Sequence, residues 1–275
     1  MTPSPTPPDP ERAVSPKDAF VTVYGRKPVL EALSDPALVV DKVVLAEGVD
    51  RGAVRTFTEA ARARGLVLQR ASAQRVKVLA GNGRQDQGVL ADVVAPRMRP
   101  LEHFLADLPE HADARVLVLD GLTNPANVGM ILRSATGAGL EGVLLPRRGA
   151  PSIDPLVVKA SAGVAFQAPV LRSRTAADGL AALAEAGFVL YGLDGPGDGT
   201  QRSSTRKDAA DVSLFDAELP GRVALVVGGE TDGLTDPVRA ELHGTLTIPL
   251  AAGVESLNAA CAATVACFEL ARRRG

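Results

Sequence analysis

The chain has 275 residues, of which 46% are hydrophobic and 23% are charged, so it is long enough and apolar enough to fold around one large core or two smaller ones. Aromatic residues make up only 3% and Trp is absent, which argues against a platform for stacking bases and favours cores of Val, Leu and Ala. The formal net charge of −2 does not by itself indicate a polyanionic partner.

The rarer residue types exclude further classes. The two cysteines, Cys261 and Cys267, do not form the pattern of a disulfide framework, which favours a reducing, cytoplasmic location. No apolar run is long enough for a membrane span, and the N-terminus lacks the features of a signal peptide, so no membrane partner is expected. The only histidines are scattered at His103, His111 and His243, so no metal site is expected.

The first part of the chain is predicted to be a disordered tail followed by a small α/β domain. Residues 1–18 contain six prolines and almost no apolar side chains, so no packed element is expected there. From residue 19 to residue 96, strand and helix signals alternate. The expected strands are Phe20–Val23, Lys42–Leu45, Leu66–Leu68 and Gln87–Val94, and the expected helices are Gly25–Leu33, Arg51–Arg64 and Ser72–Ala80.

A stretch punctuated by prolines, residues 97–114, is the expected linker to a second domain that covers residues 115–275. Its expected strands are Arg115–Leu119, Gly142–Leu145, Phe188–Leu193, Arg222–Val227 and Thr245–Ile248. Its expected helices are Pro125–Gly137, Pro155–Ser161, Thr175–Ala186, Pro237–Leu242 and Ser256–Arg273. Arg222–Val227 is almost continuously apolar, which predicts a central strand. The polar, glycine-rich stretch Gly195–Asp211 is expected to be a mobile loop.

The charge is distributed unevenly between the two expected domains. Residues 20–96 contain 11 Lys and Arg against 8 Asp and Glu, a balance of +3, whereas residues 115–275 contain 15 against 17, a balance of −2. The N-terminal domain is therefore the better candidate for contacts with phosphate. Within it we single out Arg26 and Lys27 at the start of an expected helix, where exposed backbone N–H groups also favour phosphate. Ordinary solvated charges would explain these two residues equally well.

Three loops of unusual composition follow expected strands, the place where ligands bind in open α/β sheets. They run from Asp120 to Gly139, from Gly228 to Leu234 and from Ile248 to Ala260. Taken singly, each has an ordinary explanation. Asn127 and Ser256 could cap helices. Arg133 and Glu230 could be surface charges. What favours a shared site is that all three loops occur in order, each just after a strand.

In combination these loops resemble those of SpoU-type (TrmH-like) RNA 2′-O-ribose methyltransferases of the SPOUT superfamily. The motif N-x-G-x-x-x-R-x-A stands at Asn127, Gly129, Arg133 and Ala135, and G-x-E-x-x-G-L stands at Gly228, Glu230, Gly233 and Leu234. The third motif, I-P…S-L-N, stands at Ile248, Pro249, Ser256, Leu257 and Asn258. Upstream, YGRKPVLEAL (24–33) and DQGVLADV (86–93) resemble the RNA-binding domain of the family's 23S ribosomal RNA guanosine methyltransferase branch. The family often has His where Asp86 stands, and usually Gly where Ala252 stands.

The resemblance implies a particular α/β architecture and a particular site. It implies a small N-terminal domain similar to ribosomal protein L30e and a C-terminal SPOUT domain with a deep trefoil knot. It implies S-adenosyl-L-methionine as cofactor, held by Gly228, Ile248 and Leu257, with no metal. Its implied catalytic group comprises Arg133, Asn127, Glu230, Ser256 and Asn258. RNA is the implied partner, and family members form homodimers through the knotted domain, for which the alanine-rich face of Ala259–Ala266 would suit close packing unless it is only core.

The chemistry is a displacement in which a ribose 2′-oxygen attacks a methyl carbon, so the enzyme must align the groups and help to remove one proton. The resemblance gives Arg133 this role, although free arginine is essentially always protonated. Either the site lowers the affinity of Arg133 for its proton, or the charged side chain pairs with a neighbouring phosphate and stabilises the developing alkoxide. Asn127 would orient Arg133 or the ribose, and Glu230, Ser256 and Asn258 would hold the site and the substrate backbone.

Several alternatives remain at this point. The RNA could be a guanosine of 23S ribosomal RNA, a transfer RNA, or a ribosomal site whose methylation confers antibiotic resistance. A non-catalytic RNA-binding ribosome factor would be expected to lack Arg133 or Asn258, and both are present. A nucleotide-binding Rossmann enzyme would need G-x-G-x-x-G directly after its first strand, whereas Gly137 and Gly139 fall at the far end of a helix.

Overall fold

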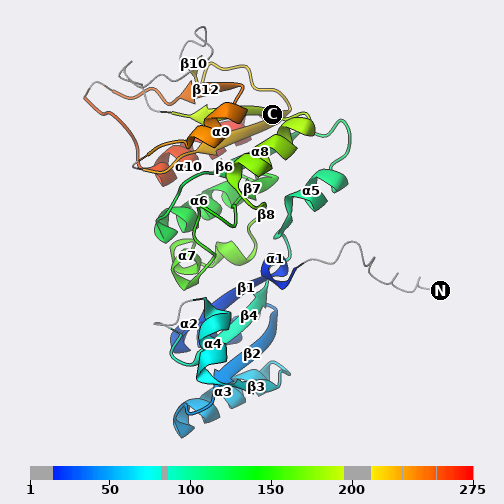
Figure 1. Ribbon diagram of the computed structural model, residues 1–275, viewed down its shortest axis with the longest axis vertical. Helices are drawn as coiled ribbons and strands as arrows, with labels where there is room; N and C mark the ends of the chain where they lie inside the picture. Colours follow the sequence, from blue (N-terminus) through cyan, green and yellow to red (C-terminus); the bar gives the residue numbers. More distant parts are fainter. Residues whose placement is uncertain (1–14, 82–85, 195–211, 231, 252, 275) are drawn as a thin grey trace, which may run out of the picture.

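The structure is a computed structural model that describes residues 15–81, 86–194, 212–230, 232–251 and 253–274. The chain forms two lobes, with the short helix α1 (Pro16–Ala19) at their junction (Figure 1). The stretch Gly195–Asp211, for which we expected a mobile loop, lies outside the described residues. No helix within the described ranges is long and apolar enough to cross a membrane.

The smaller lobe is a four-stranded sheet in the order β1-β4-β2-β3, covered by helices on both faces. The strands β1, β4 and β2 pair antiparallel, and β2 pairs parallel with β3. Their bounds are β1 Phe20–Tyr24, β2 Val40–Ala46, β3 Leu68–Ala71 and β4 Val89–Val94, and the helices are α2 (Arg26–Ser34), α3 (Arg51–Ala63) and α4 (Ala73–Ala80). Helices α2 and α3 pack on one face, and α4 packs on the other.

One strand of this lobe begins later than expected. We predicted a strand at Leu66–Leu68, but Leu66 closes the end of α3 by donating its backbone N–H to the carbonyl of Ala61. Gly65, with a φ of +70°, makes the left-handed turn that this closure needs. The strand β3 therefore starts only at Leu68.

The larger lobe is an eight-stranded sheet in the order β10-β12-β9-β11-β6-β7-β8-β5, and every neighbouring pair is parallel. The strands are β5 (Arg99–Pro100), β6 (Ala114–Leu119), β7 (Gly142–Leu144), β8 (Val170–Arg172), β9 (Val189–Leu193), β10 (Val212–Ser213), β11 (Arg222–Val227) and β12 (Gly244–Thr247). The strand β11 lies inside the sheet between β9 and β6, which confirms its predicted central position.

Helices cover both faces of this sheet. Helices α6 (Pro125–Gly137), α7 (Pro155–Ala160) and α10 (Ala259–Arg272) pack on one face. Helices α5 (Leu101–Asp107), α8 (Ala176–Glu185) and α9 (Asp236–Glu241) pack on the other. A short 3-10 turn, Val164–Phe166, lies between α7 and β8. The alanine-rich face of α10 faces the sheet and α6, so its alanines are core of this chain.

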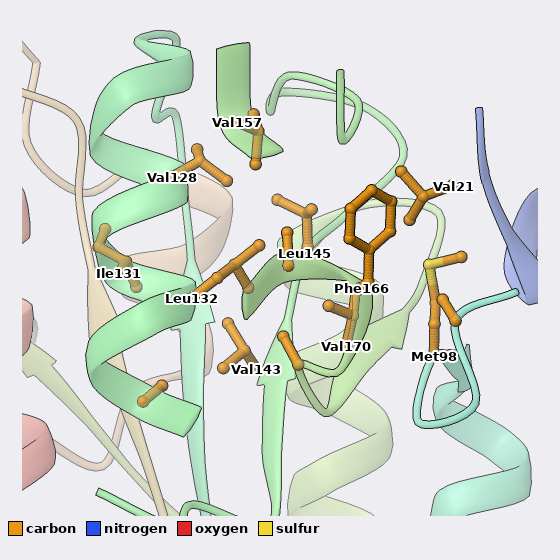
Figure 2. Close-up of a cluster of buried hydrophobic side chains, with 14 of the residues drawn as sticks. Val21, Met98, Val128, Ile131, Leu132, Val143, Leu145, Val157, Phe166 and Val170 are labelled. Carbon is orange, nitrogen blue, oxygen red and sulfur yellow. The ribbon is translucent and has the colours of Figure 1, made fainter. Parts of the chain in front are cut away.

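Two stretches are more ordered than the sequence led us to expect. Part of the predicted linker forms β5 and α5, and α5 buries Leu101 and Phe104 in the larger lobe. Asp18, the last residue of the predicted tail, is buried in α1 with its Oδ2 atom 2.5 Å from Nη2 of Arg147. The core also continues from one lobe into the other, where Val21 and Met98 approach Phe166 and Val170 (Figure 2).

Candidate active site

The three motif loops lie at one edge of the larger sheet. They follow β6, β11 and β12, which run in the same direction, so their carboxyl ends point to the same edge. The third loop must also cross the end of β9 to reach the first two. The strands β12 and β6 are separated by three strand spacings of about 4.8 Å each.

A hydrogen-bonded cluster joins one residue from each loop. The Nδ2 atom of Asn127 donates to Oε1 of Glu230 at 2.5 Å, and Nδ2 of Asn258 donates to the same oxygen at 2.7 Å. Asn258 is also 3.3 Å from Oδ1 of Asn127. Only 2% of Asn127 is exposed, so its amide depends on these partners. The sequence-predicted residues Asn127, Glu230 and Asn258 therefore meet, and a single carboxylate oxygen links all three loops.

Local capping explains how two of these residues are presented. Asn124 caps α6 by accepting a hydrogen bond from Ala126, so Asn127 lies inside the helix and its side chain is available to the cluster. Asn258 caps α10 through Oδ1, which accepts from Ala260 and Cys261, while its Nδ2 atom faces Glu230. Our alternative that Asn127 and Ser256 are helix caps is wrong, and the last helix starts at Ala259, after its Asn cap.

The second loop is a tight hairpin of glycines. The backbones of Gly229 and Gly233 exchange two hydrogen bonds of 3.0 Å. A Cβ atom at Gly228 would lie 2.4 Å from the carbonyl carbon of Gly233, and one at Gly229 would lie 2.6 Å from the carbonyl oxygen of Gly121. The main chains of the first and second loops thus approach more closely than any side chain would permit.

Asp120 also ties the first loop to the end of the second, and it was not among the site residues that we predicted. It is buried at the end of β6, and its Oδ2 atom accepts a 2.7 Å hydrogen bond from the backbone N–H of Thr235. Its position could have identified it, because Asp120 is an acidic residue that directly follows a buried strand and begins a motif loop.

Arg133 and Ser256 are not hydrogen-bonded to this cluster. Both are exposed, and neither side chain makes a hydrogen bond or ion pair with the residues that the structure describes. Asn127 makes its side-chain hydrogen bonds to Glu230 and Asn258, and none to Arg133. Among these described residues nothing pairs with the guanidinium of Arg133, so it is available to a ligand.

The residues expected to hold the cofactor fit an adenosine moiety in chemical type. Ile248 and Leu257 are half-buried apolar side chains at the ends of the third loop, and Gly228 lies on the close-packed glycine hairpin. Apolar side chains can pack on the faces of a purine, and a main chain without side chains can approach its edge. These three residues thus suit an uncharged aromatic ring with polar edges.

The ranges that the structure describes contain no cluster of metal ligands. No three His, Cys, Asp or Glu side chains gather there as a metal site would require. Burial raises the pKa of the Cys267 thiol to about 12, so this cysteine is a packing residue of α10.

In the smaller lobe, the predicted RNA contacts each have an acidic neighbour. Nη2 of Arg26 is 2.7 Å from Oδ2 of Asp50, and Nζ of Lys27 is 3.8 Å from Glu31. The backbone N–H of Arg26 donates to Gln87 at 2.8 Å, so that N–H of the α2 N-terminus already has a partner. The side chain of Arg26 is 47% exposed and that of Lys27 is 87% exposed, so both can exchange these partners for phosphate.

Comparisons with known proteins cover nearly the whole chain. The family model of the SpoU rRNA Methylase family matches residues 114–268, and the model described as RNA 2'-O ribose methyltransferase substrate binding matches residues 22–99. The chain is 35% identical to the 23S rRNA (guanosine-2'-O-)-methyltransferase RlmB of Xylella fastidiosa, over 92% of this chain and 96% of that protein. It is 32% identical to an uncharacterized tRNA/rRNA methyltransferase of Mycolicibacterium vanbaalenii, over 92% and 76%.

Solved structures of SpoU and TrmH-family methyltransferases also match this chain. The SpoU methyltransferase AviRb from Streptomyces viridochromogenes, in complex with AdoMet, matches with a TM-score of 0.59 and 25% identity over 93% of this chain and 91% of that one. A putative RNA methyltransferase of the TrmH family from Porphyromonas gingivalis matches with a TM-score of 0.57 and 27% identity over 94% and 91%. The predicted α/β fold class is confirmed, while the knot stays a prediction. By its family match and its curated relatives, the chain belongs to the SpoU rRNA methylase family.

Proposed function

We propose that this protein transfers a methyl group from S-adenosylmethionine to the ribose 2′-hydroxyl of a guanosine in 23S ribosomal RNA. The observation that carries the proposal is the Asn127–Glu230–Asn258 cluster, which assembles the three family motifs at one sheet edge. The choice of RNA is supported by the full-length likeness to relatives named as 23S rRNA guanosine methyltransferases.

When bound, S-adenosylmethionine would supply an electrophilic methyl group and a neutral leaving group. Gly228, Ile248 and Leu257 would bind its adenosine part, with the two apolar side chains excluding water from the purine faces. The cluster of Asn127, Glu230 and Asn258 holds the loops in place, so that these contacts form without reorganisation.

Arg133 would act on the RNA as a cation. An exposed guanidinium is charged in water, and its planar donors suit a phosphate or a developing alkoxide. In this role Arg133 keeps its proton. Of the two mechanisms that the sequence left open, we favour this one, in which the charged side chain pairs with phosphate. Ser256, exposed in the third loop, would hydrogen-bond to the substrate backbone.

The two lobes would divide the work. The smaller lobe, including Arg26 and Lys27, would hold the structured RNA, and the larger lobe would hold the cofactor and carry out methyl transfer. We further propose a cytoplasmic homodimer formed through the larger lobe. Met130 on α6 and Phe268 on α10 support this, because these helices pack together and the two apolar side chains are 41% and 53% exposed.

The test is methyl transfer with purified full-length protein and tritiated S-adenosylmethionine. Unmodified 23S ribosomal RNA, 16S ribosomal RNA and bulk transfer RNA would be offered separately, and labelled products would be digested to nucleosides. We expect label in 23S RNA as 2′-O-methylguanosine. Label only in transfer RNA would favour the transfer RNA alternative, and label on a base would contradict the proposed ribose chemistry.

A further inference from the structure

Four arginines gather at the carboxyl edge of the larger sheet, outside the three motif loops. Arg147 and Arg148 follow β7, and Arg172 and Arg174 stand at the end of β8 and just beyond it. The two segments run side by side, since the backbone N–H groups of Arg147 and Arg148 donate to the carbonyls of Ser173 and Arg174 at 3.0 and 3.1 Å. We call the exposed members, Arg147, Arg148 and Arg174, the arginine patch.

The position of the patch links the candidate active site to the smaller lobe. In the sheet order, β7 and β8 lie between β6, which carries the first motif loop, and β5, next to the helix α1 that leads into the smaller lobe. Asp18 of α1 contacts Arg147 at 2.5 Å and Arg172 at 3.9 Å. An RNA held by the smaller lobe with one ribose at the motif loops would therefore pass this part of the edge.

The patch together with the partly buried Arg172 carries an excess of positive charge. The four arginines have two acidic partners among the described residues, Asp18 and Asp178, which leaves a formal charge of +2. Asp18 is only 2% exposed, so it neutralises part of the arginine charge from inside the protein and leaves the outer surface of the patch uncovered. Burial lowers the pKa of Arg172 to about 10, which still leaves it charged at neutral pH.

Arg148 shows most clearly that the patch is not simply structural. It is exposed, and its side chain makes no hydrogen bond or ion pair within the described ranges. By contrast, Arg172 donates to the carbonyl of Leu145 at 2.8 Å and helps to hold the two segments together. These arginines stand on two segments joined by backbone hydrogen bonds, and their charge is only partly neutralised, so the patch suits a polyanion.

We propose that the arginine patch binds the phosphate backbone of the substrate RNA between the smaller lobe and the active site. The inference rests on the proposed function for the identity of the RNA. The contacts are with phosphate, so the patch positions the RNA and reads no sequence.

The experiment is an RNA-binding titration of the full-length protein with 23S ribosomal RNA across a salt series. The variants are Arg148→Ala, Arg148→Glu and Arg148→Ala/Arg174→Ala. The matched control is Arg272→Ala, which removes an exposed arginine at the end of α10, near the start of β6 and so at the opposite edge of the sheet. Steady-state methyl transfer and titration with S-adenosylhomocysteine would be measured on the same proteins.

We expect the double variant to lose about tenfold in RNA affinity and to show a salt dependence flatter by roughly 1–2 in log–log slope. Arg148→Glu should bind more weakly than Arg148→Ala. The KM for RNA should rise while kcat and the affinity for S-adenosylhomocysteine stay within about twofold, because phosphate contacts away from the motif loops contribute equally before and during reaction. Arg272→Ala should match the wild type in RNA affinity, salt slope and methyl transfer, since Glu269 keeps Arg273 as its ion-pair partner.

RNA affinity and salt slope unchanged in the double variant, or a loss of cofactor affinity in place of RNA affinity, would overturn the inference. An intact chain that binds no RNA would overturn it as well. The proposed function fails separately: a wild-type protein that binds RNA through Arg148 but transfers no methyl group to it would contradict only the methyltransferase assignment for that RNA.

Discussion

The side-chain amide of Asn127 donates a 2.5 Å hydrogen bond to Glu230, although the two residues are 103 positions apart in the sequence. Asn258 donates to the same carboxylate oxygen, so Glu230 is the acceptor that holds the three loops together. The first loop is also tied to the end of the second by the hydrogen bond from Thr235 to Asp120, so removing Glu230 should weaken the site without unfolding the lobe.

Glu230→Ala should lower the free energy of unfolding by about 1–3 kcal/mol, because it leaves the buried amide of Asn127 without its acceptor. Methyl transfer should fall more than stability does, and Glu230→Gln, which keeps an acceptor oxygen, should retain more of both. Urea unfolding and the tritium-transfer assay would measure the two effects. Asp232→Ala, an exposed acid of the same loop, is the control, and an equal effect of both alanine variants would contradict this role for Glu230.

Gly129 allows α6 to approach α7 closely. A Cβ atom there would lie 2.5 Å from the carbonyl oxygen of Val157 and 2.6 Å from Cβ of Ala160, so Gly129→Ala should destabilise the protein by about 1–3 kcal/mol. Gly137→Ala, in the same helix with open space around it, should be neutral or stabilise by up to about 1 kcal/mol. Urea unfolding curves of the pair would decide, and similar values for both would contradict the packing argument.

Arg133 should matter for chemistry and not for cofactor binding. Arg133→Ala should lower kcat by about a thousandfold while the affinity for S-adenosylhomocysteine, measured by calorimetric titration, stays within a few fold. Arg133→Lys keeps the positive charge and should retain more activity than Arg133→Gln. If lysine were no better than glutamine, charge alone would not explain the role of Arg133.

Leu257 tests the position of the cofactor. An aspartate in its place would put a carboxylate without a partner against the purine, so affinity for S-adenosylhomocysteine should fall about 30-fold or more, or roughly 2 kcal/mol. Leu257→Met, which keeps volume and apolarity, is the matched control. Unchanged affinity in a folded Leu257→Asp protein would place the cofactor elsewhere.

Glu269 should contribute stability that depends on pH. Hydrogen bonds from Arg272 and Arg273 lower the pKa of this carboxyl to about 2, from about 4.5. A lowered pKa stabilises the fold above about pH 4.5, and the effect is lost progressively as pH falls toward 2. Glu269→Gln should therefore cost about 1–3 kcal/mol at pH 7 and much less near pH 3. Urea unfolding at both pH values would test this, and a difference independent of pH would contradict it.

The motif residues that meet in the structure could be predicted because each follows a strand of one parallel sheet. Asn127, Glu230 and Asn258 reach the same edge for that reason alone. The sequence could not show that Asn127 bonds to Glu230 and Asn258 and not to Arg133, since that depends on side-chain directions set by the capping of α6 at Asn124.

The missed elements had little local signal. The strands β5 and β8 contain two and three residues, too few for a periodic pattern, and α5 lies among prolines. The contacts of Asp18 with Arg147 and Arg172 form only when the two lobes come together. The residues near Asp18 in the sequence therefore could not predict them. The helix α6 was predicted to the residue, because Pro125 marks its first turn.

The most direct test of the account is to map ribose methylation at nucleotide resolution in 23S ribosomal RNA from wild-type cells and from cells that lack this protein. We expect one 2′-O-methylguanosine to disappear in the deletion strain. The modification should return with the intact gene and not with the Arg133→Ala variant. An unchanged 23S methylation pattern, with or without a lost methyl group in transfer RNA, would contradict the central claim.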